Sequence, residues 1–176
     1  MTTPTYKTAI FAGGCFWCME KPFDNMKGVI KTVSGYTGGN SENATYAQVS
    51  RGNTGHIEAM EVTYDPSIVT YDELLPVFWR NIDPLDAGGQ FCDRGDHYRS
   101  ELFYADEEEK AAAMASKAAH EDILGKTIVT QVSPATVFYD AEDYHQDYYQ
   151  TNPIRYKYYR WNCGRDQRLE ELWGKE

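Results

Sequence analysis

The chain has 176 residues and a formal net charge of -10 at pH 7, and 41% of its residues are hydrophobic. This length predicts a single domain over residues 1–176, large enough to bury about 70% of the surface of its unfolded chain. The negative charge argues against binding to nucleic acid or to an anionic membrane, because both require clustered Lys and Arg. No signal peptide is recognisable and no apolar run approaches the about 20 residues that span a bilayer, so we expect a cytoplasmic protein. Four cysteines are too few for a disulfide scaffold and favour catalytic, metal-binding or inert roles.

The first predicted strand ends in two glycines and a cysteine. Residues 6–12 have the pattern of a strand, and Phe16, Met19 and Phe23 then recur at helical spacing. Cys15 therefore lies at a strand-to-helix turn, where unpaired backbone N–H groups and the helix dipole favour a thiolate. A single cysteine is more often a small buried hydrophobe. Two cysteines around an aromatic pair, in the run Gly-Gly-Cys-Phe-Trp-Cys, favour a nucleophile instead.

This motif closely resembles the signature of the A-type peptide-methionine sulfoxide reductases. Further similar segments extend from about Lys7 to His145. The resemblance implies reduction of the S epimer of methionine sulfoxide, free and in oxidised proteins, with thioredoxin as the external reductant. It implies no metal or organic cofactor, and we expect a monomer.

The second predicted strand covers residues 28–36 and runs into a glycine-rich turn. A tyrosine at such a strand end is usually a packing residue with a hydrated hydroxyl. The Ser-Gly-Tyr-Thr-Gly-Gly run, however, resembles the family segment whose tyrosine bonds the substrate oxygen. The resemblance therefore implies that role for Tyr36.

The strand over residues 55–64 carries a candidate acid. Alternation places Glu58 on one face with Met60 and Val62. If that face is the inner one, desolvation raises the pKa of Glu58 and keeps it protonated near neutral pH, able to act as a general acid. If it is the outer one, Glu58 is a solvated charge, and alternation leaves both open. The Gly-His-x-Glu pattern resembles that of the family and implies that Glu58 is the acid.

A charged loop over residues 86–96 leads into a predicted strand over 97–104. The segment resembles a Gln-x-x-Asp-x-Gly-x-x-Tyr-Arg-Ser stretch that lines the family's active site. The resemblance implies that Asp93 orients a water or a thiol and that Tyr98 pairs with Tyr36 on the sulfoxide oxygen. Cys92 stands where many relatives have no sulfur, and we expect it to be an inert or peripheral thiol.

The order of predicted elements indicates an α+β fold. Capping boxes at Thr70-x-x-Glu73 and Asp106-x-x-Glu109 each begin a helix, and residues 126–139 have the pattern of strands. Strands and helices then alternate as in a two-layer sandwich, with helices packed on a mixed, mainly antiparallel sheet. The resemblance implies a ferredoxin-like plait for a core of about residues 6–150. For the tyrosine-rich tail, 151–176, we expect an irregular segment that covers the core, and we expect His145 to be structural.

The reaction has clear chemical requirements. A sulfoxide needs a soft nucleophile for its sulfur, an acid for its oxygen and an apolar pocket for its methyl group. The expected roles are attack by Cys15, protonation by Glu58 with Tyr36 and Tyr98, and a methyl pocket made by Phe16 and Trp17. Methionine then leaves a sulfenic acid on Cys15, which condenses with a second thiol to a disulfide that an external dithiol reduces.

Two cysteines can resolve the sulfenic acid. Cys18 is close along the chain, but three residues at a helix start do not ensure disulfide geometry. Cys163 is distant in sequence and lies in the tail. We expect Cys163 to be the first resolving residue, with Cys18 as the alternative or as a second, recycling partner.

Two other classes of protein fit part of the pattern. A Cys-x-x-Cys after a first strand also begins a glutaredoxin-like thiol-disulfide oxidoreductase, but disulfide exchange needs none of the polar residues named above. A structural zinc site usually has two close pairs of ligands, whereas Cys92 and Cys163 are isolated in sequence. Both alternatives are therefore weaker than the reductase.

Overall fold

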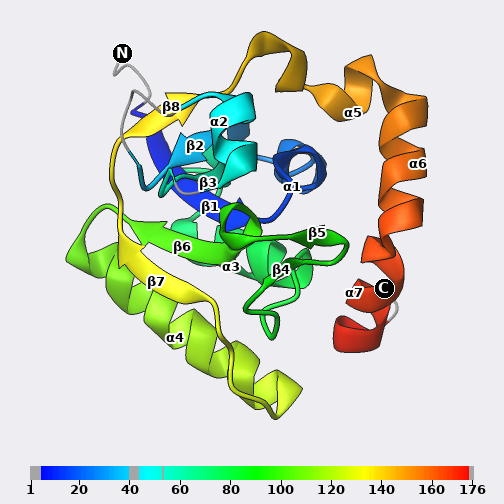
Figure 1. The fold of residues 1–176 in the computed structure, drawn as a ribbon. Coiled ribbons are helices and arrows are strands. Elements are labelled where there is room, and N and C mark those ends of the chain that lie inside the picture. Colours follow the sequence, from blue (N-terminus) through cyan, green and yellow to red (C-terminus); the bar gives the residue numbers. More distant parts are fainter. Residues whose placement is uncertain (1–4, 40–43, 53, 175–176) are drawn as a thin grey trace.

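A six-stranded sheet forms the centre of the protein (Figure 1). The structure is a computed structural model, and it describes residues 5–39, 44–52 and 54–174. The strands lie in the order β7-β6-β1-β3-β2-β8. Neighbouring strands pair antiparallel except β6 and β7, which are parallel. The strands are β1 (Lys7–Gly13), β2 (Val29–Thr37), β3 (Ile57–Tyr64), β6 (Ser100–Tyr104), β7 (Gln131–Pro134) and β8 (Phe138–Asp140).

The four inner strands confirm the expected plait. In the order β6-β1-β3-β2, two strand–helix–strand units interleave, as in a ferredoxin-like fold. The connecting helices are α1 (Phe16–Asp24) and α3 (Tyr71–Arg80), and α4 (Glu107–Leu124) follows β6. All three contribute side chains to one hydrophobic core with the inner strands, where Phe11, Phe78 and Trp79 are fully buried.

The two predicted capping boxes begin α3 and α4. The side chain of Thr70 accepts a hydrogen bond from the Glu73 N–H at 3.2 Å, and that of Asp106 accepts one from the Glu109 N–H at 2.8 Å. Each bond pairs an N–H group that the first helical turn leaves unsatisfied.

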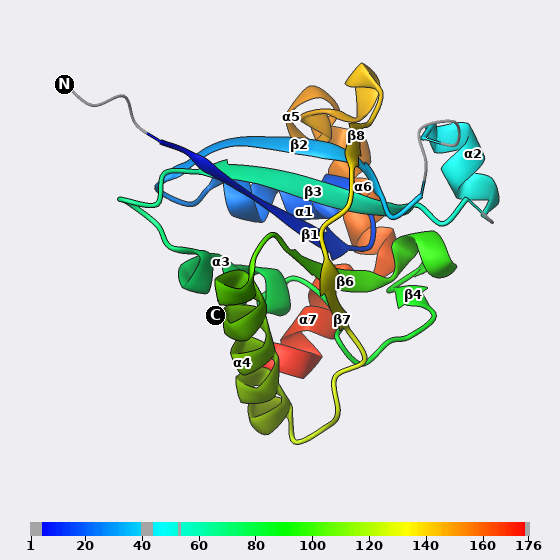
Figure 2. The same ribbon diagram turned by 90° about the vertical axis from the view of Figure 1, so that its left-hand side faces the viewer.

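The opposite face of the sheet is crossed by the chain between β7 and β8. These strands lie at opposite edges, and the segment that joins them runs across the strands (Figure 2). Ala135 donates its N–H to the Tyr104 carbonyl at 2.8 Å, and the Thr37 hydroxyl donates to the Val137 carbonyl at 3.0 Å. The sequence pattern predicted strand over residues 126–139 with a break at Ser133-Pro134. In the structure the strands are shorter, because residues before Gln131 do not pair and the residues between β7 and β8 cross the sheet.

The C-terminal region is helical, so the expectation of an irregular tail was wrong. Pro153 begins α6 at a position that suits its missing N–H, and Gly164 separates α6 from α7 in a left-handed conformation with φ 74°. In Figure 1 these helices run along the edge of the molecule next to α1. The helices are α5 (Tyr148–Thr151), α6 (Pro153–Cys163) and α7 (Arg165–Trp173).

Several short elements that the sequence pattern did not predict lie near the N-terminal end of α1. They are α2 (Tyr46–Arg51), the hairpin of β4 (Gly89–Gln90) and β5 (Asp93–Arg94), and two 3-10 turns at Asp96–Tyr98 and Asp143–His145. The strand expected over 97–104 therefore begins only at Ser100. Among the residues described, no helix is long and apolar enough to cross a membrane.

Candidate active site

The turn between β1 and α1 is built from glycines for steric reasons. Gly14 has φ +85°, and a Cβ atom there would lie 2.5 Å from the side chain of Gln90. A Cβ on Gly13 would lie 2.6 Å from the sulfur of Met19. Side chains at either position would push the turn away from the core. The close packing places Cys15 at the N-cap of α1, 6% exposed.

A small cavity of about 70 Å³ lies over Cys15. It brings together most of the residues singled out in the sequence, from the N-terminal end of α1, β3, the β4–β5 hairpin and the 3-10 turn that follows it. Its lining residues are Cys15, Phe16, Trp17, Tyr46, Glu58, Asp93, Tyr98 and Tyr159.

Glu58 lies on the inner face of β3. Alternation in the sequence had left open whether this face or the other one is turned to solvent. It is 1% exposed, and its Oε1 accepts a hydrogen bond from the Phe16 N–H at 3.2 Å. Burial raises the pKa of Glu58 well above its usual value, and the nearby charges of Asp93 and Cys18 raise it further. This shift favours the neutral, protonated form of the Glu58 carboxyl, which lies at the N-terminal end of α1.

Tyr98 and Tyr46 bring hydroxyl groups to the same carboxyl. The Tyr98 side chain is hydrogen-bonded to Glu58 and to Tyr46. Burial raises the pKa of both tyrosines, with Glu58 as the next cause, so both keep their protons. Tyr46 was missed in the sequence analysis. The available signal was Thr45-x-x-Gln48, because the Thr45 side chain caps α2 by accepting from the Gln48 N–H at 3.3 Å.

Tyr36, expected on the substrate oxygen, lies elsewhere. Its hydroxyl donates to Glu142 Oε1 at 3.1 Å, its ring packs 5.8 Å from that of Phe16, and it is not among the residues that line the cavity. Glu142 also accepts the N–H of Tyr46 at 3.2 Å. The Tyr36 side chain thus packs behind the cavity wall. Tyr46 lines the cavity where the Tyr36 hydroxyl was expected.

Cys15 and Cys18 are both free thiols in the first turn of α1. Cys18 is fully buried, and its N–H donates to the Cys15 carbonyl at 3.1 Å. The pKa of the Cys18 thiol is lowered to about 6, first by the hydrogen bond from Cys15 and then by the guanidinium groups of Arg165 and Arg160, against the opposing effect of burial. Burial, followed by the hydrogen bond to Cys18, raises the pKa of the Cys15 thiol well above its usual value, so the shared proton lies on Cys15 and the negative charge on Cys18.

Aromatic contacts fix the walls made by Phe16 and Trp17. The Trp17 indole N–H donates to His145 Nδ1 at 3.0 Å, and its ring stacks on Tyr148 at 3.9 Å. His145 is fully buried and its ring also lies 5.0 Å from Phe16. His145 therefore orients the two aromatic walls from behind.

Asp93 reaches the cavity from β5. Its Oδ2 accepts the hydroxyl hydrogen of Tyr159 from α6. Burial raises the pKa of Asp93, whereas the bond from Tyr159 lowers it. Tyr159 also lies edge-on to Trp17, with ring centroids 5.8 Å apart, so α6 closes one side of the cavity.

Cys92 is not an isolated thiol, contrary to expectation. It forms a disulfide with Cys163 across 71 residues of sequence, with Cα atoms 4.9 Å apart. Cys163, expected to be the first resolving residue, therefore has no thiol in this state. The bond joins the tip of the β4–β5 hairpin to the last residue of α6, and nothing in the sequence spacing indicates that these segments meet.

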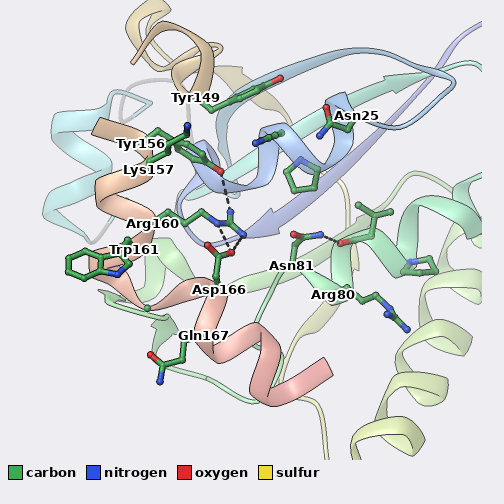
Figure 3. Close-up of a pocket in the computed structure, with 15 residues that line it drawn as sticks. Asn25, Arg80, Asn81, Tyr149, Tyr156, Lys157, Arg160, Trp161, Asp166 and Gln167 are labelled. Atoms are coloured by element: carbon green, nitrogen blue, oxygen red, sulfur yellow. Dashed lines mark hydrogen bonds and ion pairs between the residues drawn. The ribbon is translucent and has the colours of Figure 1, made fainter. Parts of the chain in front are cut away.

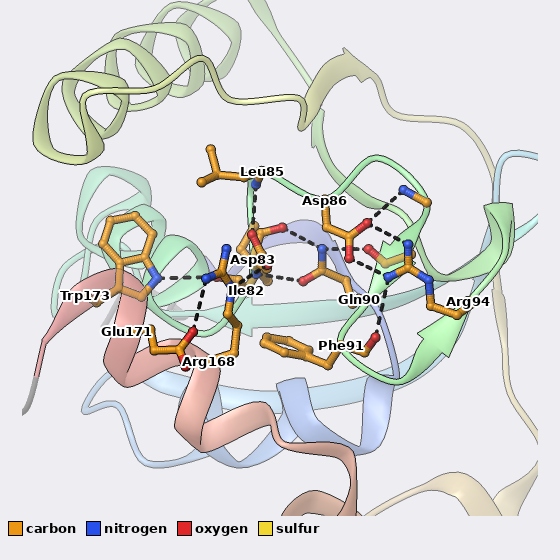
Figure 4. Close-up of polar contacts among 12 residues, drawn as sticks. Ile82, Asp83, Leu85, Asp86, Gln90, Phe91, Arg94, Arg168, Glu171 and Trp173 are labelled. Carbon is orange, nitrogen blue, oxygen red and sulfur yellow. Dashed lines mark hydrogen bonds and ion pairs between the residues drawn. The ribbon is translucent and has the colours of Figure 1, made fainter.

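The hairpin and α7 are held by a compact polar network (Figure 4). The Gln90 side chain exchanges two hydrogen bonds with the backbone of Asp83, at 2.8 and 2.7 Å. Arg168 of α7 bonds the Asp83 carboxylate at 3.0 Å, and the Trp173 indole donates to the Ile82 carbonyl at 3.3 Å. These contacts fix the hairpin that carries Cys92 and Asp93.

Comparison with known proteins decides the family. A family model described as peptide methionine sulfoxide reductase matches residues 7–176. The peptide methionine sulfoxide reductase MsrA of Bacillus velezensis is 52% identical over 167 residues, 94% of each chain. The chain belongs to the peptide methionine sulfoxide reductase family.

Solved structures of this reductase family share the fold. Reduced Mxr1 from Saccharomyces cerevisiae superposes with a TM-score of 0.82 and 30% identity, covering 87% of this chain and 89% of that chain. Mxr1 in complex with Trx2 superposes with a TM-score of 0.57 and 24% identity, covering 84% and 87%. As a member of this family, the chain is an oxidoreductase that reduces methionine sulfoxide.

A larger groove of about 990 Å³ lies between α1, α3, α6 and α7 (Figure 3). On its α6–α7 side, Arg160 bonds Asp166 at 2.8 Å and Tyr156 at 3.2 Å. None of the nucleophile, acid and tyrosines of the small cavity lines this groove. The reductase chemistry therefore belongs to the small cavity, although the groove has the greater volume.

Proposed function

We propose that the chain reduces methionine (S)-sulfoxide through attack of the Cys15 thiolate on the sulfur, with Glu58 as the acid for the oxygen. The observation that carries this proposal is the buried Glu58 carboxyl, with its pKa raised by burial, in the same small cavity as Cys15. A protonated carboxyl can donate to a departing oxygen, whereas an ionised one cannot. The Cys15 sulfur lies at the positive end of α1, which favours negative charge there, and Cys15 passes its shared proton to Cys18 as it attacks.

The hydroxyls of Tyr46 and Tyr98 bind the sulfoxide oxygen in this proposal. Both keep their protons and both lie beside Glu58, so they can donate to an oxygen that gains negative charge as the sulfur is attacked. Phe16 and Trp17 supply an apolar wall for the methyl group. Asp93, held by Tyr159, orients the water that leaves.

The size of the cavity supports a substrate that enters by its tip. A volume of about 70 Å³ admits the sulfoxide end of one side chain and leaves the amino acid backbone outside. Free methionine sulfoxide and exposed sulfoxides in oxidised proteins can therefore both present the reacting group. We assign both as substrates.

We assign the first resolving step to Cys18. Its sulfur is hydrogen-bonded to Cys15 and its pKa is lowered to about 6, so a thiolate is already next to the sulfenic acid when methionine leaves. Condensation forms a Cys15–Cys18 disulfide and water. A dithiol protein of the thioredoxin class then restores the enzyme, as the Trx2 complex of Mxr1 suggests for that relative.

The enzyme acts in this proposal as a cytoplasmic monomer with one domain. All residues that line the cavity come from one chain. Re-reduction by a dithiol protein of the thioredoxin class, as proposed above, takes place in a reducing compartment such as the cytoplasm.

The test is turnover of each sulfoxide epimer with dithiothreitol, for wild type, Cys15→Ser and Glu58→Gln. We expect turnover of the S epimer only, its abolition in Cys15→Ser, and a fall in kcat of about 10²- to 10⁴-fold in Glu58→Gln. Wild-type activity should decrease as the pH rises through the raised pKa of Glu58, because only the protonated acid is active. That decrease should be missing in Glu58→Gln.

Two results would contradict the proposal. Sulfoxide turnover by Cys15→Ser would exclude Cys15 as the nucleophile. Rapid reduction of a small disulfide without sulfoxide turnover would favour the glutaredoxin-like alternative.

A further inference from the structure

The groove between α1, α3, α6 and α7 is lined by more positive than negative side chains, although the chain has a formal net charge of -10. Of the described residues that line it, only Asp166 carries a carboxylate, and this carboxylate lies 2.6 Å from the Arg160 guanidinium. The other cations of the lining are Lys21 of α1, Arg80 of α3 and Lys157 of α6. Their three charges are not balanced within the groove.

These three cations are exposed and form no ion pairs. Within residues 5–39, 44–52 and 54–174, no carboxylate lies within ion-pair distance of Lys21, Arg80 or Lys157. They come from three helices, and Figure 3 shows Lys157 and Arg80 on opposite walls. A small anion is bound by donors that converge on it. The spread arrangement instead suits a ligand whose negative charges are distributed along its length.

Aromatic side chains line the α6 side of the same groove. The rings of Tyr149 and Tyr156 lie 6.1 Å apart, and Trp161 is 76% exposed. Aromatic side chains and arginines are enriched where proteins bind other polypeptides. The lining therefore favours an acidic polypeptide segment as the ligand.

The groove continues from the active-site cavity along two helices. Trp17 lines the cavity and Lys21, four residues later, lines the groove, so both side chains lie on one face of α1. On α6, Tyr159 lines the cavity while Tyr156 and Arg160 line the groove. A chain that enters the cavity by one side chain can therefore extend into the groove.

The spacing along α1 sets which residues of such a chain reach the groove. The rise along the helix is about 6 Å from Trp17 to Lys21 and about 12 Å from Trp17 to Asn25, which also lines the groove. One residue of extended chain covers about 3.3 Å. With a sulfoxide in the cavity, the second to fourth residues from it lie over the groove.

We propose that this groove is a second binding site for oxidised protein substrates and takes acidic residues two to four positions from the methionine sulfoxide. The inference rests on the function proposed above, because it places the sulfoxide in the small cavity. Its new element is a preference among protein substrates, set by Lys21, Arg80 and Lys157. Free methionine sulfoxide has no flanking residues and gains nothing from the groove.

The experiment compares three peptides of equal length that each contain one methionine (S)-sulfoxide. They carry Glu, Gln or Lys at the second to fourth positions on both sides of it, and dithiothreitol is the reductant. We expect the wild-type KM to be about 3- to 10-fold lower for the Glu peptide than for the Gln peptide, and highest for the Lys peptide. The kcat should be equal for all three, since the groove binds the ground state and the transition state alike. High salt should reduce the KM difference by screening exposed charges.

A matched pair of variants separates the groove from the overall charge. Lys21→Gln/Lys157→Gln removes two charges of the groove, and Lys110→Gln/Lys126→Gln removes two exposed charges near the ends of α4. We expect the KM ratio of the Gln and Glu peptides to fall below about two in the groove variant and to stay at the wild-type value in the control. All three proteins should reduce free methionine (S)-sulfoxide equally, which shows that the groove variant is folded and that its cavity works.

Three results would overturn the inference and leave the proposed function intact. They are equal KM values for the Glu and Gln peptides in wild type, a preference that the groove variant retains, and an equal loss of the preference in both variants. The last result would mean that net charge alone sets the preference. A wild type that does not reduce free methionine (S)-sulfoxide would overturn the proposed function as well.

Discussion

At the scale of single residues, the site depends on which tyrosine points a hydroxyl at Glu58. Tyr36 and Glu58 are opposite each other on neighbouring strands, yet the Tyr36 hydroxyl is held by Glu142 at 3.1 Å. Tyr46 reaches the cavity from the start of α2 and is hydrogen-bonded to Tyr98. The two tyrosines therefore form a matched pair for mutation.

Removing the Tyr46 hydroxyl should slow the reaction, and removing the Tyr36 hydroxyl should not. We expect Tyr46→Phe to lower kcat about 10-fold or more, since one donor to the developing oxyanion is lost. Tyr36→Phe should stay within about threefold of wild type and lose about 1 kcal/mol of stability with its hydrogen bond. Steady-state kinetics and thermal unfolding of both variants check this. A larger kinetic effect at Tyr36 would place that residue on the substrate.

Most residues of the cavity could be predicted from the sequence. Cys15, Glu58, Asp93 and Tyr98 belong to short motifs, and the structure brings their side chains to one cavity. Tyr46 could not be predicted. The neighbouring Thr45-x-x-Gln48 pattern indicates only a helix cap, and the position of Tyr46 depends on a contact with Glu142, which is far along the chain. Whether Glu58 faces inward was undecided by alternation, since β3 is buried on both faces through most of its length.

At the scale of elements, α7 is attached to the turn that carries the nucleophile. Arg165, 1% exposed, donates to the Gly13 carbonyl at 2.9 Å and to the Asn81 carbonyl at 2.7 Å. Its guanidinium lies 4.5 Å over the Phe91 ring. The first residue of the helix therefore places a positive charge below the β1–α1 turn and close enough to Cys18 to lower its pKa.

Neutralising the charge of Arg165 should raise the pKa of the first thiol to ionise in the Cys15–Cys18 pair. With the Cys92–Cys163 disulfide intact, thiolate absorbance near neutral pH reports only Cys15 and Cys18. We expect the midpoint, about 6 in wild type, to rise by about one unit in Arg165→Met. Arg165→Lys keeps the charge and should keep most of the low midpoint. An unchanged midpoint in Arg165→Met would show that the hydrogen bond with Cys15 alone sets it.

The inner strands and the first helices followed from the sequence because their apolar spacing is regular and their caps are clear. The tail did not, because α6 presents tyrosines and charges around much of its surface and buries only Tyr156. Its helical state depends on docking against the core, a contact that no local pattern records. For the same reason the meeting of Cys92 with Cys163 followed only from the folded chain.

At the scale of the whole molecule, one buried carboxyl joins the first helix to the C-terminal region. Glu20 of α1 is fully buried, and its Oε1 accepts the Asp147 N–H at 2.8 Å. The pKa of Glu20 is raised to about 8, mainly by burial and also by the charges of Asp147 and Asp24. Between pH 4.5 and about 8 the folded protein therefore holds a proton here that the unfolded chain has lost.

This proton makes stability depend on pH in a defined direction. Between the unfolded pKa of 4.5 and the folded value of about 8, the folded state binds more protons, so the free energy of unfolding falls as the pH rises. Glu20→Gln keeps the acceptor for the Asp147 N–H and carries no charge. We expect its melting temperature to gain on that of wild type by several degrees between pH 5 and pH 8, at about 2–4 °C per kcal/mol for a chain of this size.

Glu107→Gln, at an exposed carboxyl of α4, is the matched control and should show no such pH-dependent gain. Thermal unfolding followed by circular dichroism, with the Cys92–Cys163 bond intact throughout, measures all three proteins. A gap between Glu20→Gln and wild type that is equal at both pH values would mean that Glu20 is ionised in the folded protein. In that case the link between α1 and the C-terminal helices would depend on the hydrogen bond to Asp147 and not on a retained proton.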